Sequence, residues 1–238
     1  MEVAIFGGVA MLSLLKKRFL LITAFSSYIL LSLTGEALAV PITATATGSL
    51  TPPRVFSSSL INGDFTIRGN GLNPPAQLLG DGVNDTTLWS FDFTSDPNLP
   101  LFPMNGTLKE ALLTLELSPR SGLLPTDSTG ISYVVRQVKI PNIPGIPGIG
   151  QTGRVTIDLL EFGFTTEEIL GTLNGSEPNR VGFPNTPNTI PWFYQDDSIV
   201  SYAELKLHAV PTPEPSTLLG LGTLALAGGT LLRRKRKG

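Results

Sequence analysis

The sequence predicts an all-β domain, a two-sheet sandwich that is jelly-roll-like and carries one short helix. Between two apolar ends the chain is rich in Thr, Ser, Gly and Pro, and its apolar runs are short and separated by turn residues. Residues 108–117 and 199–209 alternate apolar and polar side chains, with Leu112 as the one exception. Alternation with a period of two gives a strand one buried and one wet face. These two segments are therefore the clearest strands of the predicted sandwich.

The other strands follow from short runs that are bounded by turn residues. Asn62-Gly63 and Asn70-Gly71 are turn signals between such runs. Residues 155–162 are compatible with either a strand or a helix. We predict the remaining strands at residues 43–50, 64–68, 87–93 and 131–140.

One short helix is predicted at residues 165–170. Thr165 lies three residues before Glu168, which is the spacing of a capping box, and Gly171 is expected to end the helix soon after. Residues 141–150 and 182–191 are expected to be loops because both are rich in Pro.

The N-terminal segment has the order of a signal peptide. A basic run at residues 16–18 precedes an apolar run at 19–33, and Ala37-Leu38-Ala39 has the small-x-small pattern of a cleavage site. We therefore predict that residues 1–39 are removed and that the mature chain begins at Val40. Met1 and Met11 are both compatible with this order as the start of translation. An uncleaved N-terminal anchor is the alternative, and the Ala-x-Ala ending argues against it.

The part of the chain between the two apolar ends is long enough for one domain with its own core. Residues 40–212 carry 9 Lys and Arg against 16 Asp and Glu, a net charge of about −7, whereas the whole chain has a net charge of only −2. This balance argues against nucleic acid as a partner. The chain has no Cys, which excludes disulfides and thiol chemistry.

The C-terminal segment, residues 211–238, has three parts. It begins with a Pro-rich spacer, which can continue neither a strand nor the interior of a helix. Residues 216–232 carry no charge, and as a helix they would be about 25 Å long, enough to cross a thin membrane once. Five basic residues follow, and they are expected to keep this end in the cytoplasm: Arg233, Arg234, Lys235, Arg236 and Lys237.

This order of Pro213, Glu214 and Pro215, an apolar helix and a basic tail resembles the PEP-CTERM sorting signal of bacterial exported proteins. The resemblance implies export, transient anchoring in the membrane, and processing near Pro-Glu-Pro by an exosortase, a membrane transpeptidase-like protease. It implies nothing about the activity of the exported domain, residues 40–210. An ordinary C-terminal membrane anchor is the alternative, but such an anchor would not need Pro-Glu-Pro.

The residues of the domain give little support to catalysis. His208 is the only His, and it lies on the polar face of the last predicted strand. The chain has neither a Gly-x-Ser-x-Gly elbow nor a phosphate-binding loop. Asp196 and Asp197 are adjacent, so in a strand they would face opposite ways and would make a poor glycosidase pair. We therefore predict that the protein is not an enzyme.

Two groups of residues are candidates for binding. Asp81, Asn84 and Asp85 place three oxygen-bearing side chains in a short Gly-containing loop, a possible structural Ca²⁺ site, although a solvated Asx-turn loop explains the same residues. Trp192 and Tyr194 follow a Pro-rich loop and are candidates for stacking on a glycan. The alternative is that these aromatic rings fill the core. No other cofactor is expected.

Two hypotheses for the function follow from these observations. The first is an exported, non-catalytic protein of the cell surface or extracellular matrix, adhesive or bound to extracellular polysaccharide. The second is a secreted hydrolase that acts on polysaccharide. Exposed aromatic rings on a flat sheet face would favour the first, and acidic and aromatic side chains that converge in one pocket would favour the second.

Overall fold

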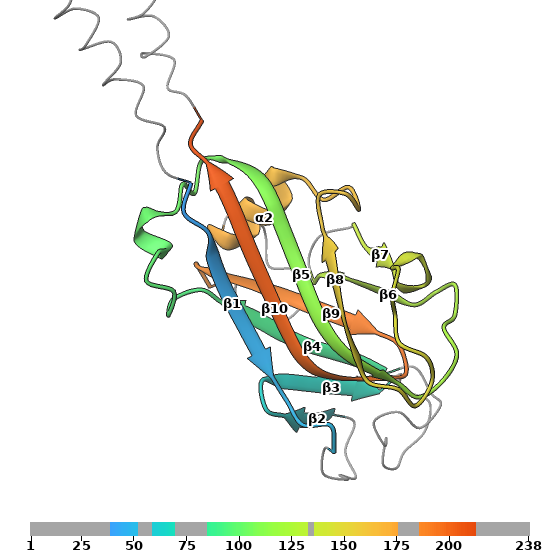
Figure 1. Cartoon of the computed structure of the whole chain (residues 1–238). Coiled ribbons are helices and arrows are strands. Elements are labelled where there is room, and N and C mark those ends of the chain that lie inside the picture. The colour runs from blue at the N-terminus through green and yellow to red at the C-terminus, as the bar shows by residue number, and fades with distance from the viewer. Residues whose placement is uncertain (1–38, 52–58, 70–84, 133–135, 176–185, 213–238) are drawn as a thin grey trace, which may run out of the picture. The chain divides into compact units, whose positions relative to one another are not determined.

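The computed structural model describes residues 39–51, 59–69, 85–132, 136–175 and 186–212. Within this part of the chain, two antiparallel sheets pack face to face around one core (Figure 1). The first sheet has the order β1-β10-β5-β8, and the second has the order β2-β3-β4-β9-β6-β7. The predicted all-β class with two packed sheets and a short helix is therefore confirmed.

The strands and short helices have the following bounds. The first sheet contains β1 (Ile42–Thr47), β5 (Thr107–Pro119), β8 (Gly153–Asp158) and β10 (Ser198–Val210). The second sheet contains β2 (Ser59–Asn62), β3 (Phe65–Gly69), β4 (Asp85–Asp92), β6 (Ser128–Ile131), β7 (Val138–Lys139) and β9 (Thr189–Gln195). The helices are η1 (Leu99–Leu101), η2 (Ile140–Asn142) and α2 (Thr166–Leu173).

The pair β5 and β10 forms the centre of the first sheet. Both strands have 13 residues, and they pair along almost their whole length. Their alternating small and aliphatic side chains face the second sheet and are at most 1% exposed, as the sequence pattern predicts. These side chains are Ala111, Leu113, Leu115, Leu117, Ala203, Leu205, Leu207 and Ala209.

A bulge at Ser201 interrupts the regular pairing of β10 with β5. The register between β10 and β5 shifts by one residue there. The Ser201 hydroxyl donates to Glu116 Oε1 at 2.8 Å, and Arg154 Nε donates to Glu116 Oε2 at 2.9 Å. The Arg154 guanidinium lies 4.5 Å from the centre of the Tyr202 ring. The hydrogen bond from Arg154, followed by that from Ser201, lowers the pKa of Glu116 below its ordinary value.

The second sheet contributes most of the aromatic core. The rings of Phe65 and Trp89 are 5.2 Å apart and nearly perpendicular, and Trp89 meets Phe91 at 5.8 Å in the same way. Phe91 in turn packs edge-on against Trp192, 6.2 Å away. These four side chains are at most 3% exposed. The chain of rings therefore crosses three neighbouring strands, β3, β4 and β9.

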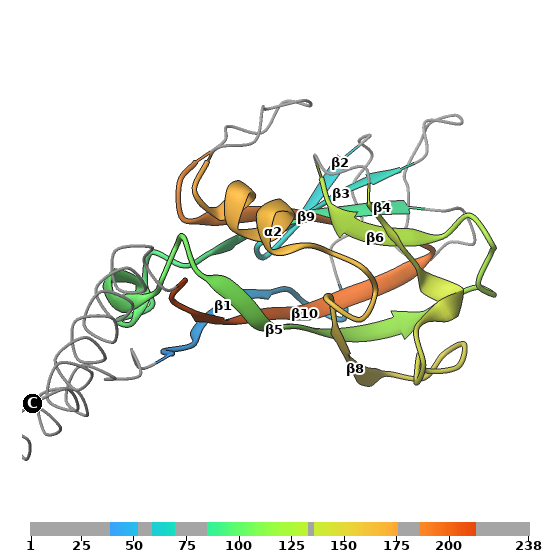
Figure 2. The same ribbon diagram turned by 90° about the horizontal axis from the view of Figure 1, so that it is seen from above.

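The helix α2 begins with the predicted capping box. The Glu168 N–H donates to Thr165 Oγ1 at 3.2 Å, and the Thr165 N–H donates to Glu168 Oε2 at 2.8 Å. Ile169 and Leu173 are fully buried, and the helix lies along β9 (Figure 2). The helix passes through Gly171 instead of ending there, because a Gly inside a helix costs only about 1 kcal/mol and burial of Leu173 offsets it.

Two other predictions about elements need correction, and one open alternative is resolved. Residues 131–140 do not form one strand, since β6 ends at Ile131 and β7 begins at Val138 and pairs back on β6. Residues 182–191 are not wholly a loop, because β9 begins at Thr189 and includes Pro191. Within 155–162 the ambiguity is resolved in favour of a strand, β8, which ends at Asp158.

The described residues contain no helix that is long and apolar enough to cross a membrane. The predicted signal peptide, apart from Ala39, and the predicted helix at 216–232 lie outside the described residues. Both therefore stay predictions.

Candidate functional site

The two ends of the described domain lie side by side at one end of the first sheet. Ile42 of β1 pairs with Leu207 of β10, so the start of β1 is next to the end of β10 (Figure 1). After β10 ends at Val210, the Thr212 hydroxyl donates to the backbone oxygen of Asn105 at 3.0 Å. Thr212, the residue that precedes Pro213, is therefore held against the domain by a hydrogen bond.

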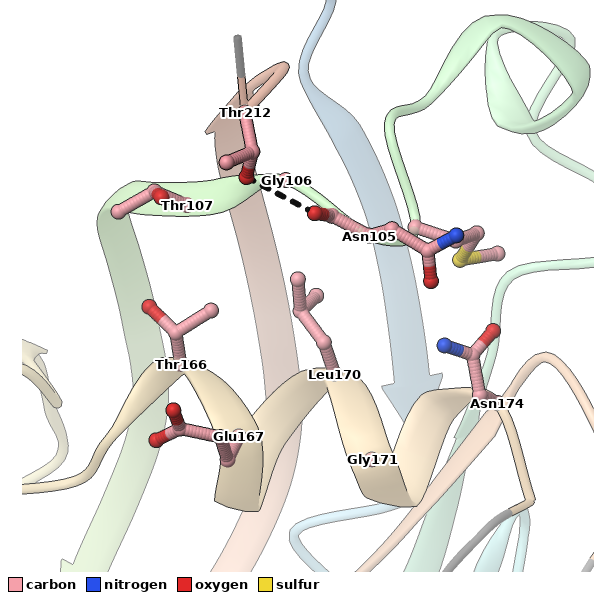
Figure 3. Close-up of a pocket in the computed structure, with 10 residues that line it drawn as sticks. Asn105, Gly106, Thr107, Thr166, Glu167, Leu170, Gly171, Asn174 and Thr212 are labelled. Atoms are coloured by element: carbon pink, nitrogen blue, oxygen red, sulfur yellow. Dashed lines mark hydrogen bonds between the residues drawn. The ribbon is translucent and has the colours of Figure 1, made fainter. Parts of the chain in front are cut away.

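A pocket of about 670 Å³ opens beside Thr212. It lies between the start of β5 and α2, with Leu170 pointing into it from the helix (Figure 3). The side-chain amides of Asn105 and Asn174 lie on the same side of the pocket (Figure 3). Its lining is Met104, Asn105, Gly106, Thr107, Thr166, Glu167, Leu170, Gly171, Asn174 and Thr212. The volume lies in the range of small-molecule sites, but the lining is more polar than is usual for them.

The opposite end of the sandwich contains a row of three buried Asp side chains. In the second sheet, Gln195 of β9 pairs with Thr86 on one side and with Ser128 on the other. The next position of the same register places Asp196 between Asp85 of β4 and Asp127, which precedes β6. These three residues, with exposed fractions of 1%, 0% and 0%, are called the acidic row below.

Burial and like charges act together on Asp196 in the acidic row. Burial, followed by the charge of Asp127 and, more weakly, that of Asp197, raises its pKa from 3.8 to about 6. The Tyr194 hydroxyl donates to Asp196 Oδ2 at 3.3 Å. Burial, followed by the charge of Asp196, also raises the pKa of Tyr194 well above its ordinary value.

Two buried oxygens near the acidic row have no hydrogen-bond partner among the described residues. One is Asp196 Oδ1, and the other is the hydroxyl of Thr87, which is 1% exposed. Thr87 pairs with Tyr194 in the row of residues directly behind the acidic row. A buried polar atom without a partner costs free energy.

The predicted glycan-stacking pair is wrong. Trp192 and Tyr194 are both 0% exposed, because β9 turns alternate residues into the core and leaves Phe193 on the other face. Trp192 Nε1 donates to Thr129 Oγ1 at 2.7 Å, and its ring packs at 5.9 Å from that of Phe164. Neither ring offers a face to a sugar. The sequence gives no clear signal for β9, because Pro191 argues against a strand on local grounds.

Only one member of the predicted Ca²⁺ loop lies within the described residues. Asp81 and Asn84 lie outside the described residues, whereas Asp85 is the first residue of β4 and belongs to the acidic row. Within the described ranges, no three acidic or His side chains already surround one point as metal ligands do. Asp196 and Asp197 lie between β9 and β10 instead of within a strand, and both are fully buried.

The remaining predicted sites lie at the C-terminal end. His208 is half-buried on the outer face of β10, opposite Glu110 of β5. Pro213, Glu214 and Pro215, as well as the basic tail at 233–237, lie outside the described residues. Their predicted roles are therefore not tested by the fold.

Comparison with known proteins bears on this C-terminal end. A PEP-CTERM protein-sorting motif matches residues 211–237, which confirms the resemblance found in the sequence. Neither a curated protein nor a solved structure matches the chain. The motif implies an exported protein of the cell envelope that is targeted to an exosortase.

Proposed function

We propose that this chain is an exosortase-processed protein of the cell surface or extracellular matrix, and that its sandwich is a non-catalytic binding module. One observation carries the proposal. The sorting motif starts at residue 211, directly after the last residue of β10, so the folded domain is joined to the motif without a flexible linker. An independent catalytic domain tethered for action at a distance would be expected to have a longer spacer.

The geometry of this junction limits where processing takes place. Residues 212–215 separate β10 and its neighbour Pro211 from the predicted membrane helix, and fully extended they span roughly 13 Å. The Pro residues keep this stretch out of the helix. In the proposal, the exosortase therefore acts in a narrow gap between the folded domain and the bilayer, and it recognises Pro213-Glu214-Pro215.

A triple substitution tests the sorting part of the proposal. In a variant with Pro213→Ala, Glu214→Ala and Pro215→Ala, we expect membrane insertion to be unchanged and removal of the tail to be blocked. Intact-mass measurement of protein from the membrane and from the medium distinguishes the two forms. A control with Pro141→Ala and Pro144→Ala, both exposed in or just after η2, should be processed normally. Normal removal of the tail in the triple variant would show that this motif is not recognised.

The binding part of the proposal concerns extracellular polysaccharide. With Trp192 and Tyr194 buried, the pocket beside Thr212 is the place where we expect a sugar to bind, because its amide groups suit hydroxyl ligands. Asn105 is exposed, so Asn105→Ala should fold normally and lose binding. Cosedimentation of the processed protein with polysaccharide measures this, with the exposed Asn142→Ala as the control. Release of new reducing ends would instead support the alternative, a secreted hydrolase.

A further inference from the structure

One loop of the domain is hydrogen-bonded to both of its ends. This loop, residues 93–106, connects β4 to β5 and is called the η1 loop below because it contains η1. The side-chain amide of Asn98 donates to the backbone oxygen of Pro41 at 3.2 Å. The backbone oxygen of Asn105 accepts the Thr212 hydroxyl at 3.0 Å. The η1 loop therefore lies at the end of the domain where β1 begins and β10 ends (Figure 1, Figure 2).

The η1 loop presents an apolar surface to solvent. Leu101 is 69% exposed, and Pro100 beside it is exposed as well. Residues 97–108 carry no charged side chain. The turn itself is held in place, because Leu99 packs against the core and the Leu101 N–H donates to the backbone oxygen of Asn98 at 2.9 Å. An exposed aliphatic side chain therefore stands on a fixed turn.

This surface is close to the predicted membrane helix. Residues 212–215 separate the domain from residues 216–232 and span at most roughly 13 Å. Leu101 is four residues from Asn105, which contacts Thr212, so Leu101 lies within about 14 Å of the place where the tether leaves the domain. The lipid headgroups extend about 5–7 Å beyond the hydrocarbon core on each side. Leu101 can therefore reach the headgroups without a change of fold.

We propose that Leu101 and Pro100 insert into the headgroup region of the lipid bilayer while the chain is anchored, so that this end of the domain lies on the membrane. The inference rests on the proposed sorting function, because the predicted helix at 216–232 supplies the tether. Single exposed apolar residues are common on soluble proteins and bind lipid only weakly by themselves. The short tether makes this contact intramolecular, so a weak intrinsic affinity is enough to keep it formed.

The weakness of the contact suits a domain that leaves the membrane after processing. Removal of the tail also removes the high effective concentration of lipid. Even a myristoyl chain gives only marginal membrane binding, and one Leu with a neighbouring Pro buries less apolar surface than that chain. The η1 loop therefore orients the domain on the bilayer before the tail is removed and lets go of it afterwards.

The opposite end of the domain offers a matched control. Ile149 is 65% exposed, and residues 140–153 also carry no charge. The Gly150 N–H donates to the backbone oxygen of Pro119, so Ile149 lies beside the end of β5, whereas the η1 loop leads into the start of β5. The 13 residues of β5 span roughly 40 Å. The two aliphatic side chains thus have similar exposure and surroundings, but differ in their distance from the tether.

Fluorescence of the full chain in phosphatidylcholine liposomes tests the proposal. Because the chain has no Cys, Leu101→Cys and Ile149→Cys variants each take a single environment-sensitive label. Lipids with a nitroxide on the headgroup should quench the label at position 101, and its emission should shift to shorter wavelength. The label at position 149 should show neither effect. Equal quenching at the two positions, or none at position 101 in chains that float with the liposomes, would overturn the proposal.

Flotation of the labelled chain with the liposomes separates this contact from the anchor. A chain that does not float refutes the anchor and the contact together, whereas a chain that floats without quenching at position 101 refutes the contact alone.

A charge on the η1 loop tests the role of Leu101 directly. In a chain labelled through Pro97→Cys, which is exposed, Leu101→Asp should lower the quenching to the level found at position 149, and flotation should persist. Ile149→Asp in the same labelled chain should leave the quenching unchanged. Far-ultraviolet circular dichroism shows that each variant is folded. Undiminished quenching in a folded Leu101→Asp variant would show that Leu101 does not make the contact.

Discussion

Replacing Asp196 by Asn should make the protein more stable at neutral pH. The pKa of Asp196 is raised from 3.8 to about 6 in the folded state. Between these two values the folded state binds more protons than the unfolded state, so the stability contributed by this group falls as the pH rises. Well above pH 6 the group is ionised in both states, and the stability that it contributes falls no further. The difference between a pKa of 3.8 and one of about 6 corresponds to a loss of about 3 kcal/mol in the free energy of unfolding.

The neutral Asn side chain avoids this loss and can still accept the Tyr194 hydroxyl through its amide oxygen. The groups that face Asp196 are Asp85, Asp127, Asp197 and Tyr194, and none of them is changed by the substitution. We therefore expect the free energies of unfolding of the variant and the wild type to differ little at pH 4. We expect a gain approaching 3 kcal/mol at pH 7.5.

Urea denaturation followed by Trp fluorescence measures this difference in the free energy of unfolding. The variant must be compared with the wild type, because the stability contributed by other carboxylates changes with pH in the opposite direction. Glu116, whose pKa is lowered, contributes stability above its unfolded pKa that is lost as the pH falls through its folded pKa. The reasoning about Asp196 would be refuted if the variant gained no stability over the wild type between pH 4 and pH 7.5.

Three further predictions concern the core, the helix cap and the anchor. Trp192→Ala should lower the free energy of unfolding by about 3–5 kcal/mol in urea titrations, because the ring is fully buried; a change below about 1 kcal/mol would contradict its place in the core. Thr165→Ala should cost about 1 kcal/mol by the same measurement, whereas Thr165→Ser should cost much less because it keeps the cap. Leu224→Arg should impair anchoring by about 2.5–3.5 kcal/mol, and membrane fractionation would show unaltered anchoring if residues 216–232 do not span the bilayer.

Much of the fold could be predicted because its strongest strands carry local signals. The alternation in β5 and β10 reports a single buried face, and the spacing of Thr165 and Glu168 reports a helix start. Both patterns depend only on residues close in the sequence. The sorting motif could be recognised for the same reason, since its three parts follow one another at the end of the chain.

The acidic row could not be predicted because it depends on the register between distant strands. Asp85, Asp127 and Asp196 are far apart in the sequence, and only the pairing of β9 with both β4 and β6 brings them together. β9 itself was hidden by Pro191, which argues against a strand on local grounds. As a consequence, the local sequence does not show that Trp192 and Tyr194 are buried.

The intact mass of the wild-type protein, isolated from the medium and from the cell envelope, tests the central claim most directly. If the chain is exported and processed by an exosortase, the mature protein begins at Val40 and ends at or near Pro213-Glu214-Pro215, within a few residues of the end of β10. A stable extracellular or envelope form that still contains residues 217–238 would contradict the account.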